Sequence, residues 1–466
     1  MFSKTYNRKE VKKVIFSGSA LIVLGLTLAF EPDLQGQQTR LTLGEAVALA
    51  QQNNHLLNVR KLQVSEKEQK VNEDRIKYLP VIGIGGTYQY NSNLPSLTID
   101  RGMFGELPLG GVGIPLPATD EVIIMGNHET YNAGISVYQP ITQIGKINAG
   151  VQVSKTDLRI ARSEEAKTSL IIGQTAEKLF FGLLIVRKQI EEAGIKVELA
   201  RARLSDAQNA LAAGKTTEAG PYGLAAAVAD EEQNLLKLQI LYDDYSADLK
   251  QLTGIESEEE ILPEPVNTEN LIEKASEPDT ALNLAAANNN DLKMASLARI
   301  KAGYSIRASR YSYLPDLGLL GGYTYQHGTV VYPKNNAYIG ASLKWNLQDL
   351  LTNRTVQLQR NFAMQQAEEN LYNIKEQVNK DIMKTFRKLK QCEELINVAG
   401  RVVTYRREDL KIQSDRRSSG LNLGSDLLAA RAAMAKAESD YYSAQLNYRI
   451  ALTELKILTG TYQDQP

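Results

Sequence analysis

The sequence contains little of the chemistry that most enzymes and metalloproteins use. Of its 466 residues, one is a cysteine, Cys392, and three are histidines, His55, His128 and His327. A single cysteine excludes an internal disulfide bond and a cysteine-based metal cluster. The histidines stand far apart, with no acidic partner at a metal-ligand spacing, and a glycine cluster in residues 83–86 opens no helix. We therefore expect no enzymatic activity, no cofactor and no bound metal.

The chain also lacks an excess of charge of either sign. Lysine and arginine total 53 against 54 aspartate and glutamate residues, and the formal net charge is -1. Without a basic field there is nothing to attract a polyanion, so we expect no nucleic-acid partner. With 43% hydrophobic residues, the composition is that of a folded protein.

The N-terminus has the pattern of a secretory signal peptide. Five lysine and arginine residues lie in residues 1–13, residues 14–30 carry no charge, and small and polar residues follow. We expect a signal peptide over residues 1–36; the alternative is an N-terminal membrane anchor, because the uncharged run is close to the shortest spanning helix. After residue 30 we find no further run with the pattern of a spanning helix.

One unusual phrase occurs twice. Residues 75–91 read RIKYLPVIGIGGTYQYN and residues 310–328 read RYSYLPDLGLLGGYTYQHG. Leu-Thr-Gly also occurs twice, at residues 252–254 and 458–460. Each copy of the phrase leaves a helical pattern, passes Leu-Pro and enters a strand pattern, so we predict a duplicated architecture.

The duplication divides the chain into two repeats, residues 37–256 and 281–460. Each is expected to run helix, strand, loop, strand, long helix, turn and helix. The first carries a Gly/Pro-rich insertion between its strands, which we interpret as a loop. The acidic, proline-bearing residues 257–280 are interpreted as a solvated linker, and residues 461–466 as a short tail.

The strand patterns predict a β-hairpin in each repeat, over residues 81–139 and 316–346. In the first strand, Ile82, Ile84, Tyr88 and Tyr90 share one face, and small or polar residues share the other. Strands of ~9–11 residues with an apolar face and aromatic ends are typical of transmembrane β-strands. The alternative is a soluble sheet packed against a core.

Four strands are too few to form a transmembrane barrel. An open sheet edge is not tolerated in lipid, and single-chain barrels use about eight strands or more. If these strands cross a membrane, several copies of the chain must therefore close the barrel together.

The helices are too long for a compact domain. Hydrophobic residues recur at helical spacing without proline from Pro140 to the Gly214 region, roughly 70 residues or about 100 Å. A matching segment spans residues 351–417. Met434, Tyr441, Tyr448 and Leu455 recur every seven residues in the last helix, as in a left-handed coiled coil.

Prolines mark the points where strands are expected to meet helices. Pro80, Pro140 and Pro315 each lie at such a boundary, because proline ends hydrogen-bonded structure and forces the preceding residue into an extended conformation. We interpret them as the junction between a β-barrel and a helical tube.

From residue 41 to residue 460, this order of elements resembles the TolC-type outer-membrane efflux factors of Gram-negative bacteria. The resemblance implies an α+β membrane protein with long coiled-coil α-helical barrel segments and four transmembrane β-strands per chain, closing as a 12-stranded β-barrel in a homotrimer.

The family's periplasmic tip motif matches Arg416, Gly420 and Asp426 between the last two helices, and the resemblance assigns Asp426 to an acidic constriction. Asp426 also suits a stabilising first-turn or N-cap carboxylate. The tip of the first repeat, at Gly214, lacks the arginine and the aspartate. Ala429 stands where some relatives carry a second aspartate.

The resemblance implies a passive exit duct of a tripartite efflux or type I secretion system, in the outer membrane with its helical tunnel in the periplasm. Its partners would be a periplasmic adaptor protein, an inner-membrane pump and outer-membrane lipid. The alternative is a periplasmic coiled-coil scaffold or interaction protein without a pore.

Overall fold

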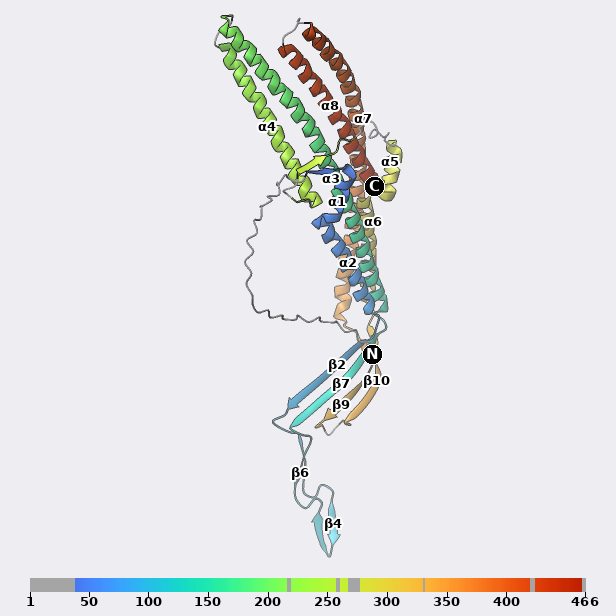
Figure 1. The fold of residues 1–466 in the computed structure, drawn as a ribbon. Helices are drawn as coiled ribbons and strands as arrows, with labels where there is room; N and C mark the ends of the chain where they lie inside the picture. The colour runs from blue at the N-terminus through green and yellow to red at the C-terminus, as the bar shows by residue number, and fades with distance from the viewer. Residues whose placement is uncertain are drawn as a thin grey trace, which may run out of the picture.

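The protein is an elongated molecule with a sheet at one end and long helices leading away from it (Figure 1). The structure, a computed structural model, describes residues 38–215, 219–256, 260–266, 277–329, 332–419 and 424–462. The expected signal peptide, residues 1–36, lies outside the described residues.

The described helices are α1 (Leu43–Asn53), α2 (His55–Ile76), α3 (Ile144–Ala212), α4 (Ala219–Thr253), α5 (Pro278–Asn288), α6 (Asn290–Tyr311), α7 (Gln348–Ser418) and α8 (Gly424–Thr459). The strands are β1 (Gln38–Leu41), β2 (Val81–Tyr90), β3 (Ser96–Ile99), β4 (Glu106–Leu109), β5 (Val112–Pro115), β6 (Glu121–Ile124), β7 (Glu129–Pro140), β8 (Glu260–Pro263), β9 (Asp316–His327) and β10 (Asn335–Lys344).

The two long helices confirm the prediction from proline spacing. α3 has 69 residues and α7 has 71, so each is about 100 Å long at 1.5 Å per residue. In the half nearer the sheet, contacts join α2 to α3, α3 to α6 and α6 to α7; in the far half they join α4 to α3, α3 to α8 and α8 to α7. The helices therefore form a one-layer wall with α7 on one side and α2 and α4 on the other.

The core lies along the middle of this wall. Phe180, Phe181 and Leu446 are fully buried where α3 meets α8. The seven-residue stripe predicted in α8 packs as expected, with Met434, Tyr448 and Leu455 buried and Tyr441 beside them. α3 alone among the described helices is long and apolar enough to cross a membrane, but half of its apolar stretch is buried by neighbouring helices.

The four long strands form one antiparallel sheet in the order β10-β9-β7-β2. The register aligns Ile84 with Ile135, Ile135 with Tyr323, and Tyr323 with Ala337. Because side chains alternate along a strand, the side chains of this row and of the rows two positions before and after it along each strand lie on the same face of the sheet. The apolar and small faces predicted from the sequence are therefore those of the sheet.

The opening helical segment of each repeat is broken, which the sequence reading missed. Asn54 separates α1 from α2 in an extended conformation (φ -66°, ψ 120°), and Asn289 separates α5 from α6 in the same way (φ -60°, ψ 129°). Each asparagine side chain then accepts backbone hydrogen bonds at the start of the next helix. After the breaks, α1 packs against α3 and α4, and α5 packs against α7 and α8.

Part of the predicted solvated linker is ordered and buried. Residues 260–263 form β8, which pairs in parallel with β1. Ile261 is completely buried beside Phe180 in the core. The acidic composition of residues 257–280 gives no indication of a strand, because β8 is defined by its hydrogen bonds to β1 and not by a local sequence pattern.

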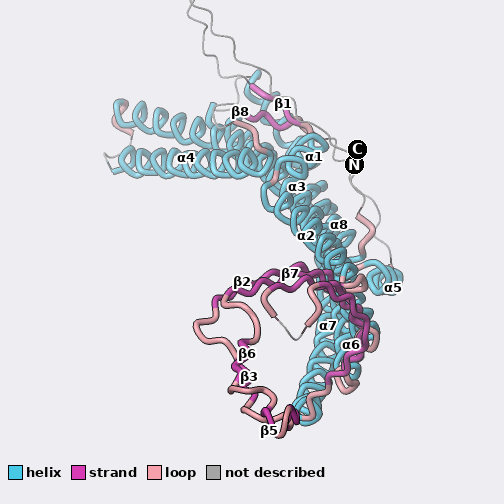
Figure 2. Tube along the Cα trace, turned by 90° about the horizontal axis from the view of Figure 1, so that it is seen from below, coloured by secondary structure: helices cyan, strands magenta, loops and turns pink. Residues whose placement is uncertain are grey.

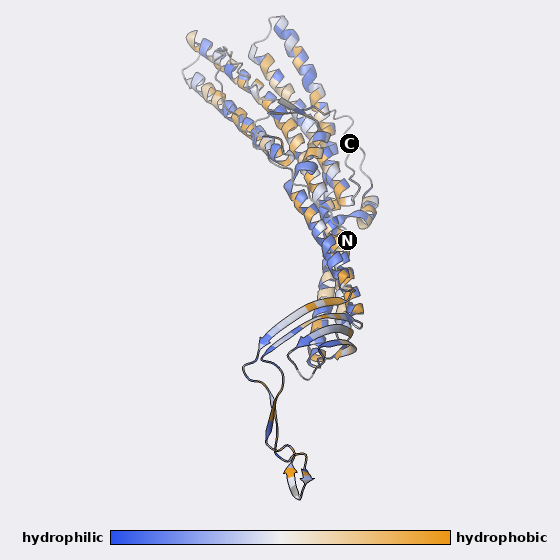
Figure 3. Ribbon diagram, turned by 60° about the horizontal axis from the view of Figure 1, so that its bottom comes forward, coloured by the Kyte–Doolittle hydropathy of each residue, from blue (hydrophilic) through white to orange (hydrophobic). Residues whose placement is uncertain are grey.

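The insertion between β2 and β7 is more than a loop. β3 pairs with β6, and β4 pairs with β5, both antiparallel. We call residues 96–124 the ribbon. It extends past the end of the sheet (Figures 1 and 3).

Candidate functional site

The apolar face of the sheet is exposed to its full width. Ile84 on β2 is 85% exposed and Ile339 on β10 is 91% exposed. Leu319 and Tyr323 on the inner strand β9 are about half exposed. Described helices and strands leave this face uncovered, although such a surface is strongly unfavourable in water.

The opposite face consists mostly of small and polar residues, with the larger Val81, Tyr138, Leu320 and Tyr338 among them. One row across it reads Gly85, Gly134, Thr324 and Asn336. Here glycine is needed, because a Cβ at Gly318 would overlap the ring of Tyr138 and one at Gly322 would overlap Tyr338. Seen from its end, the sheet curves into an arc (Figure 2).

The sheet has two edges without a strand partner among the described residues. β2 is the edge strand on one side and β10 is the edge strand on the other. An edge strand presents a row of free backbone N–H and C=O groups that can pair with another chain.

The three prolines predicted at the junction of strand and helix lie there and at one level of the molecule. Pro80 directly precedes β2, Pro140 ends β7 and Pro315 directly precedes β9. Thr142 Oγ1 donates a hydrogen bond to the Pro315 carbonyl (2.7 Å) and accepts one from the Leu317 backbone (2.9 Å). These bonds connect the junctions of the two halves of the chain.

Gly214 ends α3 at the far tip of the molecule. Its φ of +69° is in the left-handed region. The Gly214 N–H donates to Leu211 (2.8 Å) and the Lys215 N–H donates to Ala210 (2.8 Å), which is the Schellman arrangement for satisfying the last carbonyls of a helix.

Arg416 and Asp426 line one groove at the tip of the second helical hairpin, formed by α7 and α8. Arg416 lies in the last turn of α7 and Asp426 in the first turn of α8, where each charge suits the helix dipole. Both line a groove of about 380 Å³, which also holds the Arg406–Asp409 pair and Ala429. Gly420 lies outside the described residues.

A buried ion pair in the middle of the wall was not anticipated. Arg449 Nε on α8 lies 3.3 Å from Glu177 Oε1 on α3, and Thr453 Oγ1 donates to the same oxygen at 3.0 Å. Glu177 Oε2 has no hydrogen-bond partner among the described residues. Burial raises the pKa of Glu177, and the bonds from Thr453 and Arg449 offset only part of this rise. No local pattern could have paired residues so distant in the sequence.

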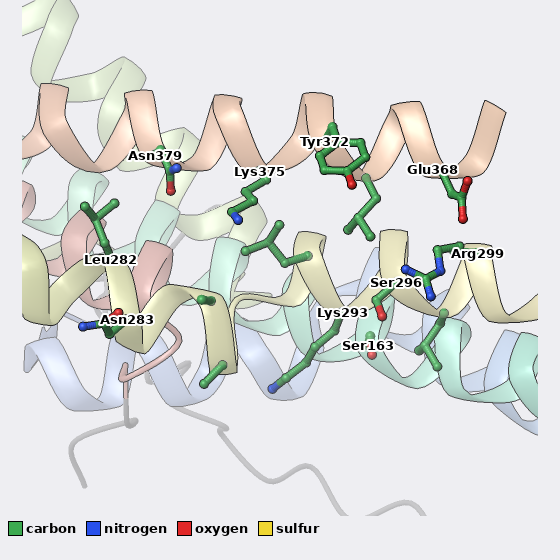
Figure 4. Close-up of a pocket in the computed structure, with 15 residues that line it drawn as sticks. Ser163, Leu282, Asn283, Lys293, Ser296, Arg299, Glu368, Tyr372, Lys375 and Asn379 are labelled. Carbon is green, nitrogen blue, oxygen red and sulfur yellow. The ribbon is translucent and has the colours of Figure 1, made fainter. Parts of the chain in front are cut away.

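A groove of about 810 Å³ opens between α6 and α7, bounded by α5 (Figure 4). Its lining mixes Leu282 and Tyr372 with the charged side chains of Arg299, Glu368 and Lys375. Within the described residues no group of three histidine, cysteine or acidic side chains is placed to hold a metal ion. The groove is thus an opening in the helical wall with a mixed apolar and charged lining.

Comparison with known proteins identifies a family and a fold. The family model of outer membrane efflux proteins matches residues 46–255 and 281–461. A membrane protein of Pseudomonas aeruginosa is similar in structure, with a TM-score of 0.70 at 13% identity over 90% of this chain and 93% of that chain. No curated protein matches the chain.

Two solved outer membrane channels are similar to the same extent. The Campylobacter jejuni CmeC channel gives a TM-score of 0.70 at 15% identity, covering 91% of this chain and 87% of that chain. The open state of the Neisseria gonorrhoeae MtrE channel gives 0.67 at 16% identity, covering 90% and 89%.

Proposed function

Because the chain belongs to the outer membrane efflux protein family, and is thus an outer-membrane transport protein, we propose that it forms the passive exit duct of a tripartite efflux or type I secretion system. Three copies would close a 12-stranded β-barrel, with the helical walls continuing it as a tunnel through the periplasm. Each repeat, residues 37–256 and 281–460, would contribute one β-hairpin and one helical hairpin.

The observation that carries this proposal is the sheet with two open edges and an exposed apolar face. In lipid, exposed apolar side chains such as Ile84 and Ile339 are favourable, whereas free edge groups are not. Pairing β2 of one copy with β10 of the next removes every edge while leaving the apolar face outward. The small and polar face would then line the lumen.

The sides of the helical wall support the same assembly. α7 exposes an apolar stripe at Leu395, Val398, Val402 and Tyr405, with the alternating three- and four-residue spacing of a coiled-coil seam. On the other side, α2 exposes Leu62, and α4 exposes further apolar side chains. Lateral packing of α7 against α2 and α4 of a neighbouring copy would bury the stripe on α7 and the exposed apolar side chains of α2 and α4.

The tips and the junction would have separate roles in this duct. We propose that the groove of Arg416 and Asp426 lies at the periplasmic aperture, with Gly420 and Gly214 shaping the turns that meet an adaptor protein. Pro80, Pro140 and Pro315 would form the seam between barrel and tunnel. Energy for transport would come from an inner-membrane pump through that adaptor.

Membrane fractionation tests the proposal. We expect the protein to stay in the outer membrane through a carbonate wash and to run as a trimer in mild detergent, because the apolar face needs lipid and the edges need partner strands. A soluble monomer would contradict the duct and favour the scaffold.

A further inference from the structure

The ribbon of residues 96–124 is a feature that an exit duct does not require. In the first repeat it lies between β2 and β7, whereas the second repeat connects β9 to β10 through residues 328–334 alone. In the connection between β3 and β4, Met103 and Phe104 are 67% and 70% exposed. Exposed side chains of this size on a two-stranded ribbon call for a partner surface.

The ribbon consists of two strand pairs, which we call tiers: β3 with β6, and β4 with β5. Each tier has one face without charged side chains. In the β3–β6 tier, Val122 pairs with Thr98 and Ile124 with Ser96, and neither pair carries a charge. Val122 and Ile124 are 60% and 64% exposed. The opposite face of this tier carries Glu121 together with Leu97, Ile99 and Ile123.

The β4–β5 tier repeats the arrangement. Leu107 pairs with Ile114 on one face, and both are more than 40% exposed. Glu106 pairs with Pro115 on the other face. The carboxylates of both strand pairs, Glu121 and Glu106, thus lie on the face opposite the uncharged one.

The base of the ribbon is tied to the end of the sheet. The Asn91 N–H donates to the His128 carbonyl (2.8 Å), and the Asn127 N–H donates to the Gly328 carbonyl (2.9 Å). Gly126 lies against the Gly328 carbonyl so closely that a Cβ would be 2.9 Å from it. These contacts give the ribbon a set direction, and Figure 2 shows β3, β5 and β6 on the concave side of the arc of the sheet.

Membrane lipid is a poor partner for these faces. β2 has ten residues, about 33 Å of extended chain, which is enough to cross an apolar band of about 25 Å. The ribbon, which begins beyond the end of β2, therefore lies outside the hydrocarbon. It also carries Asp100, Glu106, Asp120 and Glu121 against Arg101 alone, so an anionic lipid surface would repel it.

We propose that the ribbons of three copies of this chain pack their uncharged faces together over the outer mouth of the barrel and narrow it. The concave side of each sheet faces the barrel axis in such a trimer, so three ribbons that lean to that side converge. With their carboxylates turned to solvent, like charges stay apart. This inference rests on the proposed trimeric duct.

Cysteine cross-linking tests the packing with a matched pair of neighbouring residues. In a Cys392→Ser background, Val122→Cys places a thiol on the uncharged face and Glu121→Cys places one on the opposite face. With a short bis-maleimide added to trimers in outer-membrane vesicles, we expect several-fold more cross-linked dimer from Val122→Cys. Equal cross-linking in intact trimers would overturn the proposal, and would leave the face to an extracellular partner.

Conductance gives an independent readout. Replacing residues 96–124 by a short Gly-Ser turn should raise the single-channel conductance in planar bilayers, because the ribbons no longer narrow the outer mouth. An unchanged conductance from an intact trimer would overturn the proposed narrowing. Failure of the unaltered chain to form a trimer or to conduct would instead refute the proposed duct.

Discussion

Glu177 on α3 and Arg449 on α8 form a buried ion pair across the boundary between the two repeats. The atoms lie 3.3 Å apart, and the two side chains are only 4% and 11% exposed. Removing one member of such a pair leaves an uncompensated charge in a site with little access to water. The pair is thus a point where the halves of the wall depend on each other.

Arg449→Met should destabilise the protein by about 3–5 kcal/mol, because it leaves the Glu177 carboxylate buried without its cation. Denaturant unfolding of the detergent-solubilised protein, followed by circular dichroism, measures this. Lys436→Met breaks the exposed Lys436–Asp440 pair in the same helix and should cost less than about 1 kcal/mol. Equal losses would mean that the buried pair contributes no more than a surface one.

The same site predicts a pH dependence. Because burial raises the pKa of Glu177 from its ordinary 4.5, the folded state holds this proton more tightly than the unfolded state. Stability should therefore fall as the pH rises from about 4.5 through the raised pKa. Glu177→Gln mimics the protonated side chain and does not titrate. The free energy of unfolding of the variant should therefore rise relative to that of the wild type as the pH increases over this range.

Glu45 provides a control of opposite sign. Backbone and side-chain hydrogen bonds from Thr42 in the capping box lower the pKa of Glu45. The free energy of unfolding of the wild type should thus rise relative to that of Glu45→Gln as the pH rises. Unfolding curves at several pH values for the three proteins test both slopes, and a constant gap between wild type and Glu177→Gln would contradict the prediction.

Two glycines with positive φ should differ in their tolerance of alanine. A Cβ at Gly460 (φ +67°) would lie 2.6 Å from the carbonyl oxygen of Asn288, whereas one at Gly214 (φ +69°) would meet nothing within 4 Å. Gly214→Ala should cost about 1–2 kcal/mol for the left-handed backbone, and Gly460→Ala more. Thermal unfolding of both variants checks this order; equal costs would show that the α5 contact yields freely.

Arginine should be tolerated on only one face of the sheet. If the proposed barrel forms, Ile84→Arg puts a cation into lipid near the middle of β2 and should cost about 2–4 kcal/mol. Thr87→Arg, on the small and polar face of the same strand, should cost much less because the lumen holds water. Urea unfolding in lipid vesicles compares them, and similar midpoints would place both faces in water.

Asp426 should contribute to cation selectivity at the aperture. With Ala429 beside it in the groove, a single acidic ring is expected in the trimer, so cations should block the channel more weakly than in relatives with two rings. Asp426→Ala should lower the preference for cations in planar bilayers, whereas Asp409→Asn, which changes a carboxylate paired with Arg406, should change it little. Unchanged selectivity in Asp426→Ala would mean that the residue does not line the pore.

Several features could be predicted from local sequence alone. The alternation around Ile84 and Tyr88 was enough to assign both faces of the sheet, because a strand places side chains on alternate sides whatever surrounds it. The absence of proline in α3 and α7 predicted their lengths for an equally local reason.

Other features depended on contacts with distant parts of the chain. The sequence gives no sign that the helical pattern is interrupted at Asn54 and Asn289. In the structure, Asn53 Nδ2, next to the first break, donates a hydrogen bond to the Thr253 carbonyl (2.7 Å), and Asn289 Nδ2, at the second break, donates one to the Leu458 carbonyl (2.9 Å). Those carbonyls belong to the two Leu-Thr-Gly segments, so each break lies beside the end of a helix that is distant in the sequence.

The sequence by itself determined the alternation of the four long strands, the lengths of α3 and α7 and the twice-repeated Leu-Pro and Leu-Thr-Gly segments, because these depend on residues close together in the chain. Only the tertiary structure decided that β8 pairs with β1, that the ribbon is stranded and that Glu177 meets Arg449. Each of these brings together segments whose hydrogen bonds or charges find a partner only after the chain has packed, and no local pattern specifies which distant segment that will be.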